Sequence, residues 1–375
     1  MKTRAAILRE LGLPRPYAES KPLTVEEIEL APPGEGELVV RIAAAGLCHS
    51  DLSVINGAVP VLVPLVPGHE ASGVIEELGP GVTDLEIGDH VVMMFVASCG
   101  RCGFCVEGRP ALCEPGRGAN IQGTMLRGGT RISQGSDDIN HMLGVSCFAE
   151  HAVVSRESVL KIDKNLPLAE AALFGCAVVT GVGAVLNTAR MKAGSTVAVV
   201  GLGGVGLNTL LAAKLAGAGR IIAIDLLDEK LELAKRLGAT ETYNAAADKL
   251  TRDIFKSTGG GVDYAFETAG AVPALELAFA ITRTGGTTIS AGLPDRDARM
   301  QLPAAVLMLG ERTLKGSFMG SAVPTRDIPA YIELFRQGKL PVDQLMSERI
   351  GLDDLNVAFD RLADGVSIRQ LLVFG

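Results

Sequence analysis

The sequence predicts a two-domain α/β protein that combines a doubly wound parallel sheet with a β-rich part. The chain has 375 residues, which suits two domains better than one. Residues 38–118 contain short apolar runs separated by many prolines and glycines, the pattern of a turn-rich β structure. From about residue 169 onward, strand-like and helix-like segments alternate, which is typical of a parallel sheet covered by helices on both faces.

The individual elements follow from the spacing of apolar residues and from the positions of glycine and proline. The expected strands are Leu38–Ile42, Gly73–Glu76, His90–Met94, Thr196–Val200, Arg220–Ile224, Val262–Phe266, Thr287–Ser290 and Gln370–Phe374. The expected helices are Gly204–Ala216, the charged amphipathic Asp228–Leu237 and one that contains Tyr331, Leu334 and Phe335.

Composition limits the environment and the partners of the chain. The 43 acidic residues exceed the 35 basic ones, so there is no basic excess of the kind that binds nucleic acid. No apolar run is long enough to cross a bilayer, and residues 1–9 lack the apolar core of a signal peptide. We therefore expect a cytoplasmic protein with neither a nucleic-acid nor a membrane partner. Seven cysteines, an odd number in a long chain, favour metal ligation over disulfides.

The run Gly201–Gly206 (Gly-Leu-Gly-Gly-Val-Gly) is the first chemical motif, and it lies between an expected strand and an expected helix. Gly201 permits a tight turn, and Gly203 lets the backbone approach a pyrophosphate closely. Gly206 allows the helix to pack against the strand. The amide groups at the start of the helix would then face the phosphates of a dinucleotide.

Asp225 ends the next strand, where a carboxylate accepts hydrogen bonds from the adenosine ribose hydroxyls. A carboxylate at this point repels the additional phosphate of NADP, and Leu226 and Leu227 provide no basic group to compensate. The sequence therefore predicts a preference for NAD. Lys230 either contacts the same ribose or is a solvated lysine on a charged helix.

Four cysteines with the spacing Cys-x2-Cys-x2-Cys-x7-Cys form the second motif. Four thiolates at these short intervals can close around one tetrahedral zinc ion, which then has no open position and is structural. An iron–sulfur cluster is the alternative occupant of such a set. The four residues are Cys99, Cys102, Cys105 and Cys113.

The third motif is scattered over three segments, each with a metal-binding side chain beside a glycine. They contribute Cys48, His69 and Cys176. Two thiolates and one imidazole leave the fourth position of a zinc ion open for water or substrate, as in catalytic zinc sites. Taken singly, each of these residues is more often a packed or solvated side chain than a metal ligand.

In combination, these motifs resemble the zinc-dependent medium-chain alcohol dehydrogenases over nearly the whole chain. The segment Cys48–Asp51, the Gly-His-Glu at residues 68–70, the four-cysteine lobe and the glycine-rich turn occur in the family's order. The stretches 123–125, 141–144 and 367–369 resemble the liver-type and glutathione-dependent (class III-like) branches. The resemblance implies a GroES-like catalytic domain, residues 1–178 and 318–375, around a Rossmann coenzyme domain, residues 179–317.

The resemblance also implies a role for each matching residue. Cys48, His69 and Cys176 would hold a catalytic zinc ion, and the four-cysteine lobe a second one. Ser50 would accept the hydroxyl proton of the alcohol, Asp51 would orient the imidazole, and Glu70 would be a transient ligand. His49 and Arg369 would lie near the pyrophosphate. The expected cofactor contacts are Gly201, Gly203, Gly204, Val205, Gly206, Asp225, Lys230, Thr180, Gly292, Leu293 and Arg369.

The implied activity is hydride transfer between a primary alcohol or aldehyde and NAD. Gly118 stands where the family often has a larger residue, which favours bulky or aromatic alcohols. Ser53 occupies the position of the histidine that continues the proton path in liver-type enzymes, so His49 or water would take over. The substrate channel would be lined by Phe95, Val59, Met142, Leu143 and Leu293.

Two alternative functions remain open at this point. One is a thiol-dependent formaldehyde dehydrogenase of the glutathione type, which would need charged groups near the pocket to bind the thiol. The other is a non-catalytic NAD-binding relative, which would be expected to lose ligands of the catalytic zinc. The long loop favours a homodimer joined through the coenzyme domains, with residues 285–294 and 302–319 at the interface, and a tetramer is the alternative.

Overall fold

The computed structural model describes residues 1–374 and divides the chain into two compact units. Unit 1 contains Met1–Cys176, Val323–Pro329 and the chain from Met346 onward, and unit 2 contains Ala177–Ala322 and Ala330–Leu345. The predicted class is confirmed, because a β-rich unit is combined with a unit built on a parallel sheet. The domain boundaries after residues 178 and 317 stay a prediction.

Unit 1 consists of a closed barrel and a mostly antiparallel sheet. The barrel runs through β1 (Lys2–Leu8), β2 (Leu23–Leu30), β7 (Ile132–Gln134), β8 (Asp137–His141) and β4 (Leu65–Val66). The sheet has the order β10 (Val159–Ile162), β6 (His90–Met93), β5 (Ala71–Leu78), β3 (Glu37–Gly46), β18 (Gln370–Val373) and β17 (Glu348–Ile350), and β9 (His151–Ser155) also pairs with β3.

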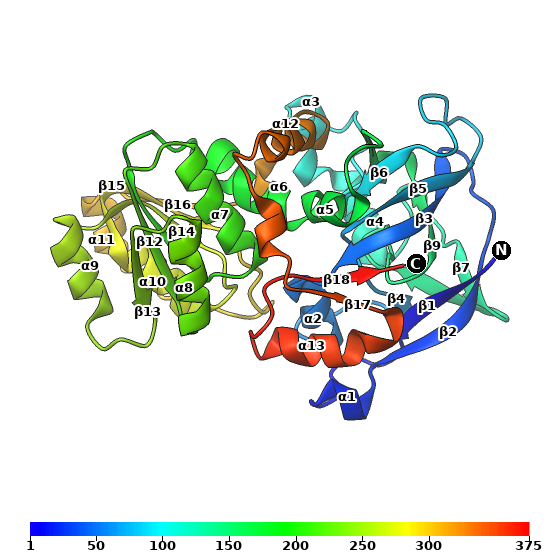
Figure 1. Cartoon of the computed structure of the whole chain (residues 1–375), viewed down its shortest axis with the longest axis horizontal. Helices are drawn as coiled ribbons and strands as arrows, with labels where there is room; N and C mark the ends of the chain where they lie inside the picture. The colour runs from blue at the N-terminus through cyan, green and yellow to red at the C-terminus, as the bar shows by residue number, and fades with distance from the viewer. Residues whose placement is uncertain (375) are drawn as a thin grey trace. The chain divides into compact units, whose positions relative to one another are not determined.

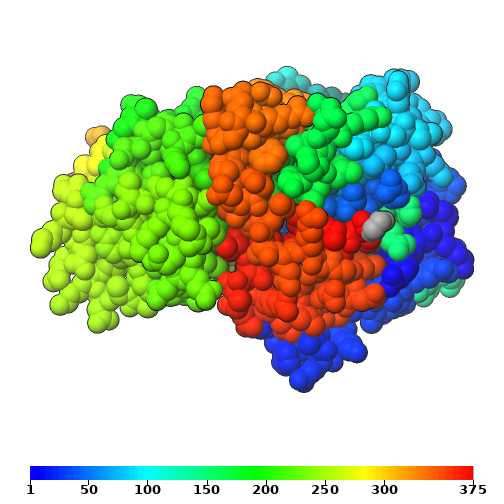
Figure 2. Space-filling model, viewed as in Figure 1, coloured from blue at the N-terminus to red at the C-terminus, as the bar shows by residue number. Residues whose placement is uncertain are grey.

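Segments from both ends of the sequence build unit 1. Strand β18 pairs with β3, with Leu372 opposite Ala45. On the surface, the segment around α1 (Tyr17–Ser20) lies against α13 (Leu355–Ala363), as blue and orange-red atoms in Figure 2. The Asp360 carboxylate joins the two segments, because it accepts hydrogen bonds from the backbone amides of Tyr17 and Ala18. The remaining helices of unit 1 are α2 (His49–Ile55), α3 (Gly103–Val106), α4 (Glu114–Gln122) and α5 (Leu168–Ala172).

Unit 2 is built on a parallel sheet with the order β13 (Glu241–Asn244), β12 (Arg220–Asp225), β11 (Thr196–Val200), β14 (Val262–Glu267), β15 (Thr282–Ser290) and β16 (Thr313–Gly316). The strand order reverses between β11 and β14, and crossovers of one hand therefore place the two sets of helices on opposite faces. Accordingly α7 contacts α8, and α9 contacts α10. Figure 1 shows these helices flanking the sheet.

The helices of unit 2 are α6 (Ala177–Gly183), α7 (Gly204–Leu215), α8 (Asp228–Leu237), α9 (Leu250–Thr258), α10 (Val272–Ile281) and α11 (Ala304–Leu309), and α12 (Pro324–Arg336) begins in unit 1. Among the described residues, no single helix is long and apolar enough to cross a membrane. One pair of helices, 168–175 and 177–189, with a bend between them, meets the length and composition expected of a membrane span, and nothing else indicates one.

Most predicted elements of unit 2 have the expected bounds. Strand β11 and helix α8 match the prediction, and β12 and β14 each extend one residue further, to an acidic side chain. Strand β15 begins at Thr282, five residues before the predicted start at Thr287. The prediction was wrong there because residues 282–286 (Thr-Arg-Thr-Gly-Gly) lack the apolar run expected of a buried strand.

Candidate metal and nucleotide sites

Three potential metal ligands from distant segments of unit 1 meet in its interior. Cys48 precedes α2, His69 lies between β4 and β5, and Cys176 follows a short 3-10 helix, Leu173–Gly175. All three side chains are buried, and their ligand atoms lie within 4.8 Å of one another. Ligand atoms around a tetrahedral zinc ion are about 3.5–3.8 Å apart. Two sulfurs and one imidazole nitrogen at this separation suit a zinc ion with one further position open.

The buried Asp51 carboxylate organises this cluster. Its Oδ1 lies 3.0 Å from His69 Nδ1 and accepts a hydrogen bond from the Gly68 amide at 3.3 Å. Its Oδ2 accepts from the Cys48 amide at 3.1 Å. A carboxylate on Nδ1 keeps the proton on that nitrogen, so that Nε2 is available as a metal ligand. One side chain thereby fixes the backbone of both ligand segments and the tautomer of the imidazole.

A hydrogen bond joins the two buried thiols. A hydrogen bond from Cys176 is the largest cause that lowers the pKa of Cys48, and the same bond raises the pKa of Cys176. Two thiolates side by side in a buried site repel each other unless a cation lies between them. This arrangement is chemically suited to a divalent metal that replaces the proton of this hydrogen bond.

A buried ion pair lies beside the cluster. Arg369 on the segment before β18 donates through Nη2 to Glu70 Oε2 and through Nη1 to the Leu47 carbonyl at 3.0 Å. Burial raises the pKa of Glu70 to about 6, although the Arg369 charge acts in the opposite direction. Glu70 Oε1 has no hydrogen-bond partner among the described residues. A Cβ atom at position 46 would lie 2.3 Å from that oxygen, so a larger residue there would displace the carboxylate.

The remaining candidate residues of unit 1 surround the cluster at different depths. Ser50 Oγ lies 3.8 Å from Cys48 Sγ, whereas the side chain of His49 is exposed at the start of α2. The ring of Phe95 packs edge-on against His69, with centroids 5.6 Å apart. Of the other expected lining residues in this unit, Met142 is buried, and Val59 and Leu143 are half-buried.

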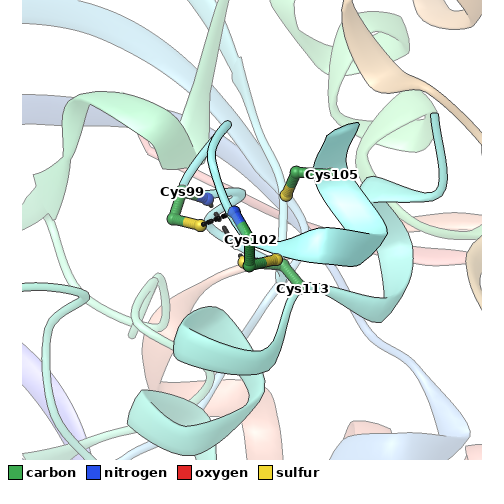
Figure 3. Close-up of side chains that lie close together, drawn as sticks. All are labelled: Cys99, Cys102, Cys105 and Cys113. Carbon is green, nitrogen blue, oxygen red and sulfur yellow. Dashed lines mark hydrogen bonds between the residues drawn. The ribbon is translucent and has the colours of Figure 1, made fainter. Parts of the chain in front are cut away.

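The four cysteines of the second motif converge on a separate lobe, around α3 and the start of α4. Figure 3 shows the four sulfur atoms turned toward a common centre, and they lie within 4.8 Å of one another. Backbone amides point at the sulfurs: Cys99 donates to Cys113 Sγ at 3.2 Å, and Cys102 donates to Cys99 Sγ at 3.3 Å. The amides of Cys105 and Glu114 lower the pKa of Cys102 to about 6. These features suit four thiolates around one metal ion.

The glycine-rich turn of unit 2 has the geometry of a phosphate-binding loop. Gly201 has φ 93°, a left-handed conformation that side chains disfavour. A Cβ atom on Gly206 would lie 1.9 Å from the Gly201 carbonyl, so helix and turn touch directly. By contrast, a Cβ atom on Gly203 would meet nothing within 4 Å. The space beside Gly203 at the start of α7 therefore suits a pyrophosphate, and Gly204 and Val205 form the first turn of that helix.

Asp225 already has two backbone partners at the end of β12. Its Oδ2 accepts from the Leu202 amide at 2.6 Å, and its Oδ1 accepts from the Leu227 amide at 3.0 Å. The carboxylate thus links the glycine-rich turn to the segment before α8. Leu226 is exposed beside it, and Lys230 is half-buried on the first turn of α8.

Thr180, Gly292 and Leu293 belong to other segments of unit 2. Thr180 is buried in α6, whereas Leu293 is about half exposed. Gly292 touches the turn after β14, because a Cβ atom there would lie 2.2 Å from the Gly270 amide nitrogen. Glu267, the buried last residue of β14, was not among the residues predicted from the sequence. The sequence does contain a signal for Glu267: it is an acidic residue that directly follows an apolar strand segment, as Asp225 does.

Comparisons with known proteins agree with this arrangement. Residues 34–164 match the family described as alcohol dehydrogenase GroES-like domain, and residues 204–337 match the zinc-binding dehydrogenase family. The chain is 39% identical to an NDMA-dependent alcohol dehydrogenase of Amycolatopsis methanolica, over 100% of this chain and 99% of the relative. It is 37% identical to an S-(hydroxymethyl)glutathione dehydrogenase of Synechocystis, over 99% and 100%. A benzyl alcohol dehydrogenase of Acinetobacter calcoaceticus matches with a TM-score of 0.92, 33% identity and full coverage of both chains.

Proposed function

Because this chain belongs to the zinc-dependent alcohol dehydrogenase family and is therefore an oxidoreductase, we propose that it transfers a hydride between bulky or aromatic primary alcohols and NAD. The buried cluster of Cys48, His69 and Cys176 carries the proposal. It is a Cys₂His set with an open fourth position, and Ser50 Oγ lies 3.8 Å from one of its sulfurs.

The residues of unit 1 have different roles around the reacting alcohol. When bound, zinc supplies a Lewis acid for the alcohol oxygen, and NAD supplies the hydride acceptor. Ser50 accepts the hydroxyl proton. The nearby exposed His49, or a water molecule, then passes this proton to solvent. Asp51 holds the imidazole of His69 in the ligating tautomer. One carboxylate oxygen of Glu70 has no hydrogen-bond partner within residues 1–374, which supports its role as a transient ligand.

The four-cysteine lobe holds a second, structural zinc ion in this proposal. Four thiolates fill every position of a tetrahedral ion, and the family to which the chain belongs is a zinc family. Elemental analysis tests this against the iron–sulfur alternative. We expect two zinc ions and no iron per chain, and a chain containing iron and inorganic sulfide would contradict the assignment.

NAD is the proposed coenzyme rather than NADP. Asp225 presents a carboxylate at the end of β12, and its exposed neighbours Leu226 and Leu227 offer no positive charge for a ribose phosphate. The proposed contacts are the glycine-rich turn, Thr180, Lys230, Gly292, Leu293 and Arg369. Of these, Arg369 is buried, and its Nη2 donates to the Glu70 carboxylate.

The proposed substrates are larger than ethanol because Gly118 leaves room beside α4. A Cβ atom at this position would meet nothing within 4 Å. The benzyl alcohol dehydrogenase among the structural relatives supports an aromatic substrate. We expect Gly118→Leu to raise the KM for benzyl alcohol about tenfold and to leave the KM for ethanol nearly unchanged. Equal kinetics of both proteins on benzyl alcohol would contradict the assignment of Gly118.

The deciding experiment measures initial rates on ethanol, hexanol and benzyl alcohol with NAD or NADP. NDMA is a third arm, because one relative depends on it. Turnover with NAD that is faster on the larger alcohols and abolished by Cys48→Ser supports the proposal. Protein with two zinc ions per chain and no turnover in any arm would refute it.

A thiol-dependent formaldehyde dehydrogenase is the second candidate, supported by the S-(hydroxymethyl)glutathione dehydrogenase among the relatives. It predicts that formaldehyde is oxidised only when glutathione or another thiol is present. Activity on benzyl alcohol without a thiol favours the first candidate. Family membership argues against the third alternative, a non-catalytic relative, because the matching proteins are enzymes.

We also propose that the protein is a cytoplasmic homodimer. All seven cysteines are free thiols, as two metal–thiolate sites require in a reducing compartment. Strand β16 is an edge strand, and α11 before it exposes Val306, Met308 and Leu309. A second copy that continues the sheet would cover both features. Light scattering in solution tests the dimer, and a monomer would contradict it.

A further inference from the structure

The C-terminal end of β14 lies between two strands that carry the proposed cofactor contacts of unit 2. Glu267, the last residue of β14, pairs in register with Val200 of β11 on one side and with Ser290 of β15 on the other. The strand order reverses between β11 and β14. In doubly wound sheets, ligands bind at the carboxyl ends of the strands beside such a reversal.

The carboxylate of Glu267 ties two loops together. Its Oε1 accepts from the Gly270 amide at 2.6 Å, and its Oε2 accepts from the Ser290 hydroxyl at 2.7 Å. The backbone carbonyl of Glu267 also accepts from the amides of Ala291 and Gly292, at 2.8 and 3.2 Å. Hydrogen bonds to a charged acceptor are stronger than neutral ones, so this buried group holds both loops firmly.

The two loops are in direct contact at Gly292, with no room for a side chain there. A Cβ atom there would lie 2.6 Å from Glu267 Oε1 and 2.2 Å from the Gly270 amide nitrogen. The position of Gly292 is therefore set by Glu267 and by the turn that Glu267 holds. Leu293 touches the same turn, because a Cβ atom on Gly270 would lie 2.5 Å from the Leu293 carbonyl oxygen, so a displacement of this turn reaches both residues.

We propose that Glu267 is a positioning residue for the nicotinamide end of the coenzyme, which acts by fixing Gly292 and Leu293 without touching the coenzyme. This inference rests on the proposed function, in which these two residues contact the nicotinamide. The adjacent Thr268 has the matching role on the other side of β14. Its hydroxyl donates to the Gly201 carbonyl at 2.6 Å, so consecutive residues hold the two coenzyme loops.

The test measures the dissociation constant of NADH by the fluorescence of the coenzyme, since the chain contains no tryptophan. Glu267→Leu leaves two donors without an acceptor, and we expect NADH binding to weaken about tenfold. We expect the KM for alcohol at saturating NAD to change less than the NADH dissociation constant, because Leu293 is the one residue of the proposed channel lining that lies outside unit 1. Glu267→Gln restores binding to within about threefold of wild type, because its amide accepts from Gly270 and donates to Ser290.

Asp263 provides a matched control at the opposite end of the same strand. Its carboxylate also links two strands, through the Thr196 amide and the Arg283 guanidinium, both at 2.7 Å. Asp263→Leu should lower the melting temperature but leave the NADH dissociation constant unchanged. A purely structural role of Glu267 predicts the same result for Glu267→Leu, which would overturn the proposal.

Ser290→Ala is a milder variant that can be measured if Glu267→Leu does not fold, because it removes only one hydrogen-bond donor to the Glu267 carboxylate. We expect NADH binding to weaken about threefold in this variant, and unchanged binding would overturn the positioning role. Failure of the wild-type protein to bind NADH would overturn the proposed function, and the positioning role with it. Normal wild-type binding with unchanged binding in the variants overturns the positioning role alone.

Discussion

Acidification is expected to destabilise unit 1 through His141, the last residue of β8. Its ring is buried, and Nε2 accepts a hydrogen bond from the Arg131 amide at 3.2 Å, so the neutral ring carries its proton on Nδ1. Nδ1 has no hydrogen-bond partner among the described residues. Burial, and secondarily the charge of Arg131, lower the pKa of His141 from 6.5 to about 4.

The sign and size of the effect follow from these two pKa values. Between pH 6.5 and pH 4 the unfolded chain binds a proton at His141 and the folded chain does not, so the free energy of unfolding falls as the pH falls. The full loss is about 3 kcal/mol, and about 2 kcal/mol of it is reached at pH 5. Above pH 7 both states are neutral, and His141 contributes no pH dependence.

A comparison with His141→Gln isolates this contribution. The glutamine oxygen can accept the hydrogen bond from the Arg131 amide and does not titrate. We expect the urea-unfolding free energy of wild type to fall about 2 kcal/mol more than that of the variant between pH 7.5 and pH 5. Equal losses in the two proteins, within about 0.5 kcal/mol, would refute the reasoning.

Three further substitutions test the sites directly. Gly206→Ala should weaken NADH binding at least about tenfold in a fluorescence titration, because its Cβ would lie 1.9 Å from the Gly201 carbonyl. Gly316→Ala, where a Cβ meets nothing within 4 Å, is the control and should bind NADH normally. Cys113→Ser should reduce the zinc content from two ions to one and lower the melting temperature, and retention of both ions would contradict the structural site. Asp51→Asn should lower kcat/KM about 10- to 100-fold, since its carboxylate sets the tautomer of the ligating imidazole, and a smaller effect would argue against that role.

The unit that carries the parallel sheet was the more predictable part of the fold. Its central segments, from Thr196 to Leu237, alternate apolar strands with helices whose glycines and charges mark their ends. The barrel of unit 1 was not predicted, because strands such as β2 are rich in glutamate and pair with partners far away in the sequence. The periodicity of side chains along one strand does not indicate which residues of a distant strand lie opposite them.

The candidate sites differ in the same way. The four cysteines of the lobe lie within fifteen residues, so that their proximity could be predicted from spacing alone. The buried pair of Glu70 and Arg369 joins residues 299 positions apart, and no local pattern indicates it. The role of Glu267 depends on the register between β14 and β15, which the sequence does not display.

The pairing of β18 with β3 has a consequence for the order in which the chain assembles during synthesis. Strand β3 and Glu70 leave the ribosome early, but their partners Gln370–Val373 and Arg369 are translated some 300 residues later. At typical rates of translation this delay is roughly 15–60 s. Almost all of unit 2 is synthesised within that interval, so it can fold first, while the incomplete sheet of unit 1 awaits its last strand. Until then, the edge of β3 that pairs with β18 in the finished protein has no strand beside it.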